Sequence, residues 1–377
     1  MKHFIYADHA ATTKLDIEAF EAMKPYLLGE YGNASQLYSF ARNPKKALLE
    51  AREKIAACIN AEPEEIYFTS CGTESDNWAL KGTMFVRDFA GYLITTEVEH
   101  HAILHSAAAL ERMRYPVRYL RVDETCTVQP TDLELIMKGI ETKLVSVMLA
   151  NNEVGSVQPI KELARIAHKH QALFHTDAVQ AVGHLEIDVK ELGVDMLSSS
   201  AHKYNGPKGI GFLYVKKGVQ LNSFMDGGAQ EFGKRAGTEN VALIVGMAVA
   251  LENNCKKINE HRNHLLHLEN VLLGELRQSD IDFIRNGSEN HVPGNISLSF
   301  KNCEGEMILH RLDLKGICVS TGSACNSKET EISHVLEAMH VPYEYVRGTI
   351  RISLGKDNTE EEVRAIAAAL KGILDSK

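Results

Sequence analysis

Residues 172–203, ALFHTDAVQAVGHLEIDVKELGVDMLSSSAHK, contain two short apolar runs that each end in polar side chains. The runs 172–175 and 195–199 have the length and composition of β-strands. Asp177 follows the first run and Lys203 follows the second. In open sheets of parallel strands, ligands bind at the carboxyl ends of the strands. This stretch therefore predicts a sheet with a ligand site that contains a carboxylate and an amine.

The same pattern extends to both sides of this stretch. The other strand candidates are residues 66–69, 92–95, 117–122, 143–149 and 209–215, and helical spacing of apolar positions occurs at residues 73–87, 102–112, 131–138 and 159–170. Strands that alternate with helices favour parallel pairing with helices on both faces of the sheet. We therefore expect an α/β fold with a mostly parallel central sheet flanked by helices.

The pattern changes after residue 240. A long helical stretch, 241–278, precedes strands at 294–300, 317–320 and 349–354, which helices such as 306–312 separate. This order predicts a second, smaller α+β domain. We expect a large domain of residues 14–257 and a small domain of residues 1–13 and 258–377.

Composition excludes several classes of protein. The chain has 377 residues, 44% of them hydrophobic, and a formal net charge of −9, which argues against nucleic acid or an anionic membrane surface as the main partner. The amino terminus lacks a secretory signal pattern, and no segment approaches the roughly 18 apolar residues of a membrane helix. We expect a cytoplasmic protein. Seven cysteines without a C-x-x-C pair indicate reduced thiols and give no support for a zinc site.

Lys203 and Asp177 each permit two interpretations. Lys203 lies in a polar, turn-rich loop, where it can form a Schiff base with an aldehyde, while the hydroxyls of Ser198 to Ser200 and the imidazole of His202 can bind a phosphate; Lys203 can also be an ordinary surface lysine. Asp177 after an apolar run needs a cation or donors, and a pyridinium nitrogen is such a partner. Its alternative role is a helix N-cap. Gln180 can hydrogen-bond the phenolic oxygen of the same ring.

Two further loops point to the same chemistry. Gly72 and Thr73 stand at an expected helix start, where backbone N–H groups and a hydroxyl can bind phosphate, although a capping box looks similar. His100 and His101 follow a strand, and either imidazole can stack on a flat ring and exchange protons. The residues alone do not choose between the two histidines. His101 and His105 have the i, i+4 spacing of a metal pair, but no third ligand is evident.

Many short motifs occur together in one order along nearly the whole chain. They are Asp8-His9-Ala10-Ala11-Thr12-Thr13, Gly32-Asn33-Ala34-Ser35, Thr73-Glu74-Ser75-Asp76-Asn77, Glu99-His100-His101, Asn151-Asn152-Glu153-Val154-Gly155, Asp177-Ala178-Val179-Gln180, Ser200-Ala201-His202-Lys203, Arg235-Ala236-Gly237-Thr238, Ser323-Ala324-Cys325 and Arg351-Ile352-Ser353-Leu354-Gly355. In these motifs the chain resembles the cysteine desulfurases of the NifS/IscS type. These are fold type I pyridoxal phosphate enzymes of the class V aminotransferase group.

The resemblance implies a role for each matching position. Lys203 would carry pyridoxal 5'-phosphate as a Schiff base, Asp177 would pair with the pyridinium nitrogen, and Gln180 would bind the phenolic oxygen. His100, the first of the two histidines, would stack on the ring and would also act as an acid and base. The remaining cofactor residues would be Gly72, Thr73, Asn152, Ser200 and His202, with Thr238 supplied by the second subunit of a homodimer. Substrate would be bound by Arg351, Asn152 and Asn33, and a bidentate arginine suits a carboxylate.

Cys325 lies in a small and polar stretch, residues 320–328, which is typical of an exposed loop. An exposed cysteine can be accidental, whereas the family resemblance makes Cys325 the residue of the small domain that receives sulfur. The implied reaction converts L-cysteine to L-alanine and leaves a persulfide on Cys325. An acceptor protein, an iron–sulfur scaffold or a sulfur carrier, would then take the sulfur for iron–sulfur cluster or thiolated cofactor and tRNA synthesis.

Three alternatives remain at this stage. Selenocysteine lyase and class V aminotransferase reactions use the same cofactor, and Cys325 favours sulfur transfer over them. A non-catalytic binding protein on a Rossmann-like sheet is the third alternative, but residues 209–211 do not form a dinucleotide fingerprint in the right place. No role follows for Cys71 in the phosphate loop.

Overall fold

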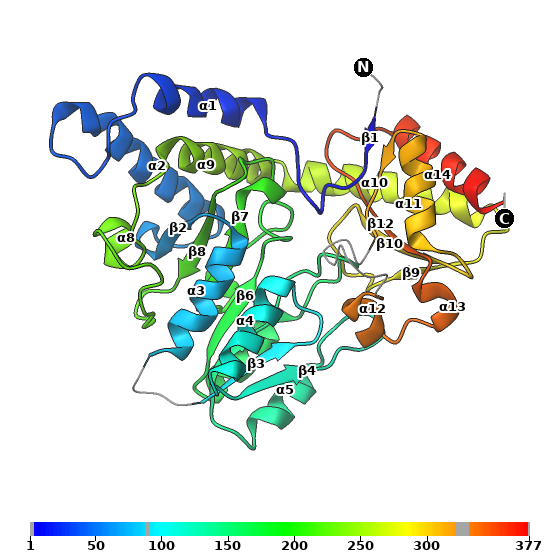
Figure 1. The fold of residues 1–377 in the computed structure, drawn as a ribbon, viewed down its shortest axis with the longest axis horizontal. Helices are drawn as coiled ribbons and strands as arrows, with labels where there is room; N and C mark the ends of the chain where they lie inside the picture. Colours follow the sequence, from blue (N-terminus) through cyan, green and yellow to red (C-terminus); the bar gives the residue numbers. More distant parts are fainter. Residues whose placement is uncertain (1–3, 87–90, 322–331, 376–377) are drawn as a thin grey trace.

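The computed structural model describes residues 4–86, 91–321 and 332–375. A large unit of sheet and helices lies beside a smaller one (Figure 1). The central sheet has seven strands in the order β2-β8-β7-β6-β5-β3-β4, and only β8 runs antiparallel to its neighbours. The strands are β2 (Ile66–Thr69), β3 (Tyr92–Thr96), β4 (Val117–Leu120), β5 (Thr142–Ser146), β6 (Leu173–Asp177), β7 (Met196–Ser200) and β8 (Gly211–Val215). The predicted strands and their mostly parallel arrangement are confirmed.

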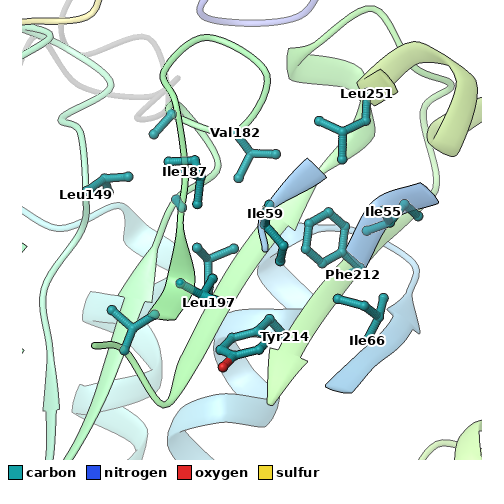
Figure 2. Packing of buried hydrophobic residues seen from close by; sticks show 14 of the residues in the cluster. Ile55, Ile59, Ile66, Leu149, Val182, Ile187, Leu197, Phe212, Tyr214 and Leu251 are labelled. Carbon is teal, nitrogen blue, oxygen red and sulfur yellow. The ribbon is translucent and has the colours of Figure 1, made fainter. Parts of the chain in front are cut away.

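Side chains alternate along these strands, so the sheet has an apolar cluster on each face. Leu197, Phe212 and Tyr214 belong to the cluster on one face, which Figure 2 shows packed against Ile55 and Leu251. Their sequence neighbours Met196 and Leu213 belong to the cluster on the other face, with Trp78. A sheet buried on both faces explains why its strands read as nearly continuous apolar runs.

Helices cover both faces of this sheet. The helices predicted between strands are present as α3 (Gly72–Met84), α4 (His101–Arg112), α5 (Pro130–Met137) and α6 (Ile160–Lys169). The large unit also contains α1 (Ile17–Leu28), α2 (Arg42–Cys58), α7 (Val189–Leu192), α8 (Gln230–Gly233) and α9 (Val241–Lys256). Among the described residues, no helix combines the length and apolar character needed to cross a membrane.

The smaller unit has its own sheet and apolar cluster. Its antiparallel sheet has the order β12-β10-β9, and β1 pairs with β11 in parallel. Its elements are β1 (Ile5–Tyr6), α10 (Ile258–Arg277), β9 (Phe283–Asn286), β10 (Asn295–Phe300), α11 (Gly305–Leu314), β11 (Ile317–Cys318), α12 (His334–Ala338), α13 (Tyr343–Val346), β12 (Thr349–Ser353) and α14 (Glu360–Leu374). The cluster combines Ala7 with residues from 265 to 373. The domain boundaries at 14–257 stay a prediction, and this cluster is in line with them.

The long helical stretch expected at 241–278 is interrupted. Lys257 has φ −119° and ψ 13°, outside the helical region, so α9 ends at Lys256 and α10 begins at Ile258. The break falls where the chain passes from α9 in the large unit to α10 in the smaller one (Figure 1).

The amino-terminal segment connects the two units. Residue Asp8 forms a bridge to Ser353 in β12, and the Ala10 N–H donates to Ser353 Oγ at 2.9 Å. Three residues later, Thr13 Oγ1 donates to the His202 carbonyl at 2.8 Å. This path carries the carbonyl groups of Ala10 and Ala11 past the carboxyl ends of the central strands.

A buried ion pair fastens α8 to the sheet. Arg52, which is 8% exposed, donates to both carboxylate oxygens of Glu231 at 2.6 and 3.0 Å, and its guanidinium lies 4.3 Å from the Phe68 ring centroid. The Phe68 N–H also donates to Glu231 at 2.8 Å. Glu231 has φ 43°, so its backbone depends on these contacts.

We expect Arg52→Ala to lower the free energy of unfolding by about 3–5 kcal/mol, because it leaves the Glu231 carboxylate buried without its cation. Chemical denaturation measures the change. The control is Lys161→Ala, which breaks a pair that is 67% exposed on both sides and should cost at most about 1 kcal/mol. Equal losses in the two variants would contradict this account of Arg52.

Candidate functional site

A cavity of about 780 Å³ lies at the carboxyl ends of the central strands. Strand ends and the loops after them supply one wall, the amino-terminal segment a second, and the smaller unit a third. The lining residues that the sequence predicted are Gly72, Thr73, His100, Asn152, Asp177, Gln180, Ser200, His202, Lys203 and Arg351. Residues far apart in the chain are thus brought together in one place.

Lys203 ends the 3-10 turn Ala201–Lys203 directly after β7. Its Nζ donates to the carbonyls of Ala10, at 2.5 Å, and Ala11, at 3.0 Å. The turn is compact because Gly206 lies against Ala201, where an added Cβ would stand 2.8 Å from the Ala201 carbonyl oxygen. The lysine is therefore aimed into the cavity by its own loop and held there by the amino-terminal segment, which excludes the interpretation as a free surface lysine.

Asp177 is the last residue of β6 and is 5% exposed. Burial raises the pKa of its carboxyl to about 6, although the Val179 N–H, which donates to Oδ1 at 2.9 Å, and the charge of Lys203 oppose the rise. Hydrogen-bonded turns follow Asp177 instead of a helix, so it is not a helix N-cap. A cation bound in the cavity would stabilise the ionised form further.

Gln180 lies on the same loop as Asp177. Its Nε2 donates to the Ala10 carbonyl at 3.0 Å, so that one carbonyl oxygen accepts from both Gln180 and Lys203. The side chain is oriented along the cavity wall by this contact.

The other end of the cavity has the character of an anion site. Gly72 begins α3, whose N-cap residue Cys71 makes no side-chain capping bond, so the capping-box interpretation does not hold. An added Cβ at Gly72 would stand 2.6 Å from Val179 Cγ2, so only glycine fits there. Ser200 Oγ is buried and has no hydrogen-bond partner among the described residues. An unpaired buried hydroxyl beside helix N–H groups fits an anionic ligand group.

The two adjacent histidines differ in their surroundings. His100 is the N-cap of α4, and its Nδ1 accepts from the Ala102 N–H at 3.1 Å. Burial, followed by the charge of Lys203, lowers the pKa of His100 to about 4, so the ring is neutral near pH 7. His101 lies farther out, with its ring centroid 5.1 Å from those of His105 and His334. The geometry favours His100 as the group that meets a ligand near Lys203.

Arg351 in β12 supplies the cationic wall from the smaller unit. It is 7% exposed and donates to the Asn152 carbonyl at 2.8 Å and to Asp8 Oδ1 at 2.9 Å. Its Nε is buried without a hydrogen-bond partner in the described part of the chain. A carboxylate ligand could use this donor.

Three predicted residues are not placed in the cavity. Thr238 is exposed and lies outside the lining, and Asn33 Oδ1 accepts from the Ser35 N–H outside it as well. Cys325 lies outside the described residues, whereas Thr321 and Ile332 on either side of that gap line the cavity.

Sequence reasoning missed several lining residues. Asp8, Asp76, Glu153 and His334 all border the cavity, and only the motifs that contain the first three gave a signal. Burial raises the pKa of Glu153 to about 7, and Ser333 Oγ donates to this carboxyl at 2.5 Å. Within the described ranges, no three His, Cys, Asp or Glu side chains are grouped so that they could hold a metal ion.

Together these groups fit a flat ligand of mixed charge. Ser200 Oγ and the start of α3 suit its anionic group, Asp177 suits a protonated ring nitrogen, and Lys203 can bond an aldehyde carbon. Arg351 is left for the carboxylate of a second, smaller ligand. The arrangement can therefore combine a covalently held ring with an amino acid substrate.

Comparisons with known proteins agree with this chemistry. Residues 5–366 match the model of the aminotransferase class-V family. The chain is 46% identical over 377 residues to "Cysteine desulfurase IscS" of Dictyoglomus turgidum, covering 100% of this chain and 95% of that one. It is 43% identical to "Putative cysteine desulfurase IscS 1" of Bacillus subtilis, covering 96% of each. A solved "NIFS-LIKE PROTEIN" is 37% identical with a TM-score of 0.93 over the whole of both chains. The structure "SspA in complex with cysteine" is 33% identical with a TM-score of 0.82, covering 94% of this chain and 100% of that one.

We expect Glu99→Gln to remove a stability loss that the wild-type protein suffers as pH rises. Glu99 is fully buried, and Oε1 accepts from the Met148 N–H and from Thr96 Oγ1, both at 2.9 Å. Burial raises its pKa from 4.5 to about 8. As pH rises, Glu99 therefore loses its proton in the unfolded chain before it does in the folded protein. The stability that the protonated Glu99 carboxyl contributes is fully present below pH 4.5 and is lost as pH rises through 8.

Glutamine keeps the acceptor oxygen and cannot ionise. Melting temperatures recorded across a pH range that brackets 8 should show wild type falling relative to Glu99→Gln as pH increases. The exposed Glu191→Gln serves as control and should follow wild type. Parallel curves for wild type and Glu99→Gln would show that the buried carboxyl does not titrate as described.

Proposed function

The chain belongs to the class-V aminotransferase family and is a cysteine desulfurase that depends on pyridoxal phosphate; we propose that L-cysteine is converted to L-alanine in the cavity described above. The observation that carries this proposal is the meeting of Lys203, Asp177, Ser200 and Arg351 around one cavity. Each supplies a different group that the reaction needs. The remaining roles of individual residues below are part of the same proposal.

Bound pyridoxal phosphate supplies an aldehyde carbon for covalent attachment and a ring that accepts electrons. Lys203 Nζ would hold the aldehyde carbon, and Asp177 would keep the ring nitrogen protonated. Gln180 and Asn152 would contact the ring. The Gly72 and Thr73 N–H groups, Ser200 Oγ and His202 would hold the phosphate. Burial and the charge of Lys203 lower the pKa of His202 to about 4, so it binds the phosphate as a neutral donor.

Proton movement depends on Lys203 and His100. When substrate occupies the site, the freed Lys203 Nζ takes the proton from the cysteine Cα, and the Ala10 and Ala11 carbonyls hold the amine in line. His100 would stack on the ring of the bound cofactor. Because its Nδ1 accepts a backbone N–H, the neutral imidazole carries its own proton on Nε2 and can donate it there.

Arg351 binds the substrate carboxylate, together with Asn152 and Asn33. Its contacts with Asp8 and the Asn152 carbonyl fix the guanidinium before substrate arrives, and Nε offers a donor that no described residue uses. A planar guanidinium can bond both carboxylate oxygens at once, which fixes the orientation of the amino acid.

Cys325 receives the sulfur. Its thiolate attacks the substrate sulfur, the Cβ–S bond breaks, and an S–S bond forms on Cys325. The electron pair of the broken bond stays on carbon, which takes up a proton to give alanine. The persulfide then passes its outer sulfur to an acceptor protein, an iron–sulfur scaffold or a sulfur carrier.

The active form is a cytoplasmic homodimer in which Thr238 reaches the phosphate site of the partner subunit. Thr238 is exposed, and the neighbouring Arg235 pairs with Glu74 of α3 at 2.8 and 3.1 Å. This pair ties the Thr238 segment to the helix that begins at Gly72. Large apolar side chains are also exposed over one stretch of the chain, and this supports a surface that the second subunit covers in the dimer. These side chains are Ile17, Phe20, Leu27, Leu28, Tyr31, Leu37, Tyr38, Phe40 and Leu49.

We expect Lys203→Ala to lower the rate of alanine formation by at least about 10²–10⁴-fold, since it removes the base that takes the Cα proton. The yellow absorbance of the covalently held cofactor should also be lost. Lys208→Ala, an exposed lysine five residues along the same loop, is the matched control and should keep both properties. Normal absorbance in Lys203→Ala would remove Lys203 from its proposed role.

We expect Cys325→Ala to keep the cofactor absorbance and to lose persulfide formation, because only the sulfur acceptor is removed. Mass spectrometry of peptides after turnover with cysteine locates the added sulfur atom. Wild type and Cys318→Ala should carry it on Cys325. Sulfur release at the wild-type rate by Cys325→Ala would contradict the sulfur-transfer step while leaving the cofactor site intact.

A further inference from the structure

Glu153 of the large unit is hydrogen-bonded to the residue that precedes α12. It lies in the turn after Asn151, is 6% exposed and borders the cavity. Ser333 Oγ donates to Glu153 Oε2 at 2.5 Å, and Ser333 is equally buried. The two residues are 180 positions apart in the sequence, so this contact connects distant parts of the chain.

The direction of this hydrogen bond follows from the other contacts of Ser333. Ser333 is the N-cap of α12, and its Oγ accepts from the N–H groups of Val335 and Leu336 at 3.1 and 3.4 Å. A hydroxyl has two acceptor positions and a single proton to donate. The helix uses both acceptor positions, so the proton goes to Glu153. A carboxyl oxygen accepts such a proton in the ionised and in the neutral state, and the contact therefore does not depend on the charge of Glu153.

The turn that carries Glu153 is itself fixed to the large unit. The Asn151 side chain is fully buried, and its Oδ1 accepts from the N–H groups of Glu153 at 2.8 Å and Val154 at 3.0 Å. Its Nδ2 donates to the Val98 carbonyl at 3.0 Å. Glu153 is thus held in place by its own turn and can hold Ser333 in turn.

Other contacts place α12 on the large unit as well. His334 Nε2 donates to the Glu99 carbonyl at 3.1 Å. An apolar cluster combines side chains of the large unit with those of α12 and the residues after it, and its members are Val98, Cys126, Val154, Val335, Leu336, Met339 and Val346. The helix therefore packs on the large unit, although β11 before it and β12 after it pair within the smaller unit.

The chain is thus attached to different units before and after Cys325. On the amino-terminal side, the Ser320 N–H donates to the Arg351 carbonyl at 3.1 Å, and the Arg351 N–H donates to the Ser320 carbonyl at 2.7 Å. This attachment is to β12 of the smaller unit. On the carboxyl-terminal side, Ser333 is attached to Glu153 of the large unit. Cys325 itself lies between these two points in the sequence and outside the described residues.

We propose that Glu153 is a positioning residue for sulfur transfer, which acts through Ser333 to fix the start of α12 beside the cavity. The inference deepens the proposed function and rests on it, because the step concerned is the attack of Cys325 on the substrate sulfur. Fixing Ser333 keeps one attachment of the Cys325 segment in place. Less freedom is then lost when the thiolate and the substrate sulfur meet.

The test compares Glu153→Ala with Glu153→Gln in the full-length protein loaded with pyridoxal phosphate. Glutamine keeps an oxygen that accepts from Ser333, whereas alanine has no acceptor. Mass spectrometry at short times after mixing with saturating cysteine measures persulfide on Cys325. We expect Glu153→Ala to slow its formation about 10-fold, the size of a lost hydrogen bond to a carboxylate, and Glu153→Gln to stay near wild type. Cofactor absorbance, and the change that cysteine produces in it, should be the same in all three proteins.

Ser333→Ala tests the route of the effect. It should also slow persulfide formation, and the double variant with Glu153→Ala should be no slower than the slower single variant. Glu344→Ala removes an exposed carboxylate from α13, the next helix, and as control should match wild type. Amide hydrogen exchange in α12 of the cofactor-free protein should be faster in Glu153→Ala and Ser333→Ala and unchanged in Glu153→Gln and Glu344→Ala.

Three results would overturn the inference. One is persulfide formation at the wild-type rate in Glu153→Ala. Another is an equal loss in Glu153→Ala and Glu153→Gln, which would assign the effect to the interaction of a Glu153 charge with Arg351. The third is unchanged amide exchange in α12 of Glu153→Ala. A wild-type protein that placed no persulfide on Cys325 would contradict the proposed function instead, and the exchange measurement would still decide whether Glu153 holds α12.

Discussion

The Asp177 carboxylate is buried at the end of β6, and the surrounding residues supply the hydrogen-bond donor and the positive charge that a buried carboxylate needs. An isolated charge in a closed interior is costly, so it needs donors and a nearby cation. The Val179 N–H and Lys203 provide these, and the histidine two residues earlier on the strand is neutral. Lys203 is in turn held by carbonyls of the amino-terminal segment, which is fixed to β12 of the smaller unit. The position of one carboxylate is thereby linked to the packing of both units.

The residues that we propose as catalytic come from two units with separate cores, and contacts between these units meet at Arg351. Its strand belongs to the smaller unit, and one of its acceptors, the Asn152 carbonyl, belongs to the large one. Asp8, the other acceptor, lies where the amino-terminal segment passes between them. A ligand carboxylate bound by Arg351 would therefore lie at the interface between the two units. The residues of the same chain that we propose to hold the cofactor, in contrast, lie at the ends of central strands and in the loops after them.

Local patterns in the sequence were enough to predict the central strands and the residues at their ends. Asp177, Lys203 and Gly72 each follow an apolar run, and period and composition reveal such runs directly. Contacts between distant segments left no such pattern, so the role of the Ala10 carbonyl and the pairing of Asp8 with Arg351 were not foreseen. The residues alone left His100 and His101 open and the family resemblance favoured His100, a prediction with which the cap that His100 Nδ1 forms on α4 is in line. The break at Lys257 was missed, although Asn253, Asn254 and Cys255 shortly before it are weak helix formers.

The Ala10 carbonyl accepts hydrogen bonds from both Lys203 and Gln180, and it is a main-chain atom. Replacing the Ala10 side chain leaves that oxygen in place, so scanning the chain with alanine or other substitutions would assign position 10 little importance. The contact is encoded by the path of the backbone and by the residues that hold this path, such as Ser353 and Thr13. Chemical replacement of the amide by an ester, or a shift of the segment by one inserted residue, would reach what side-chain mutagenesis cannot.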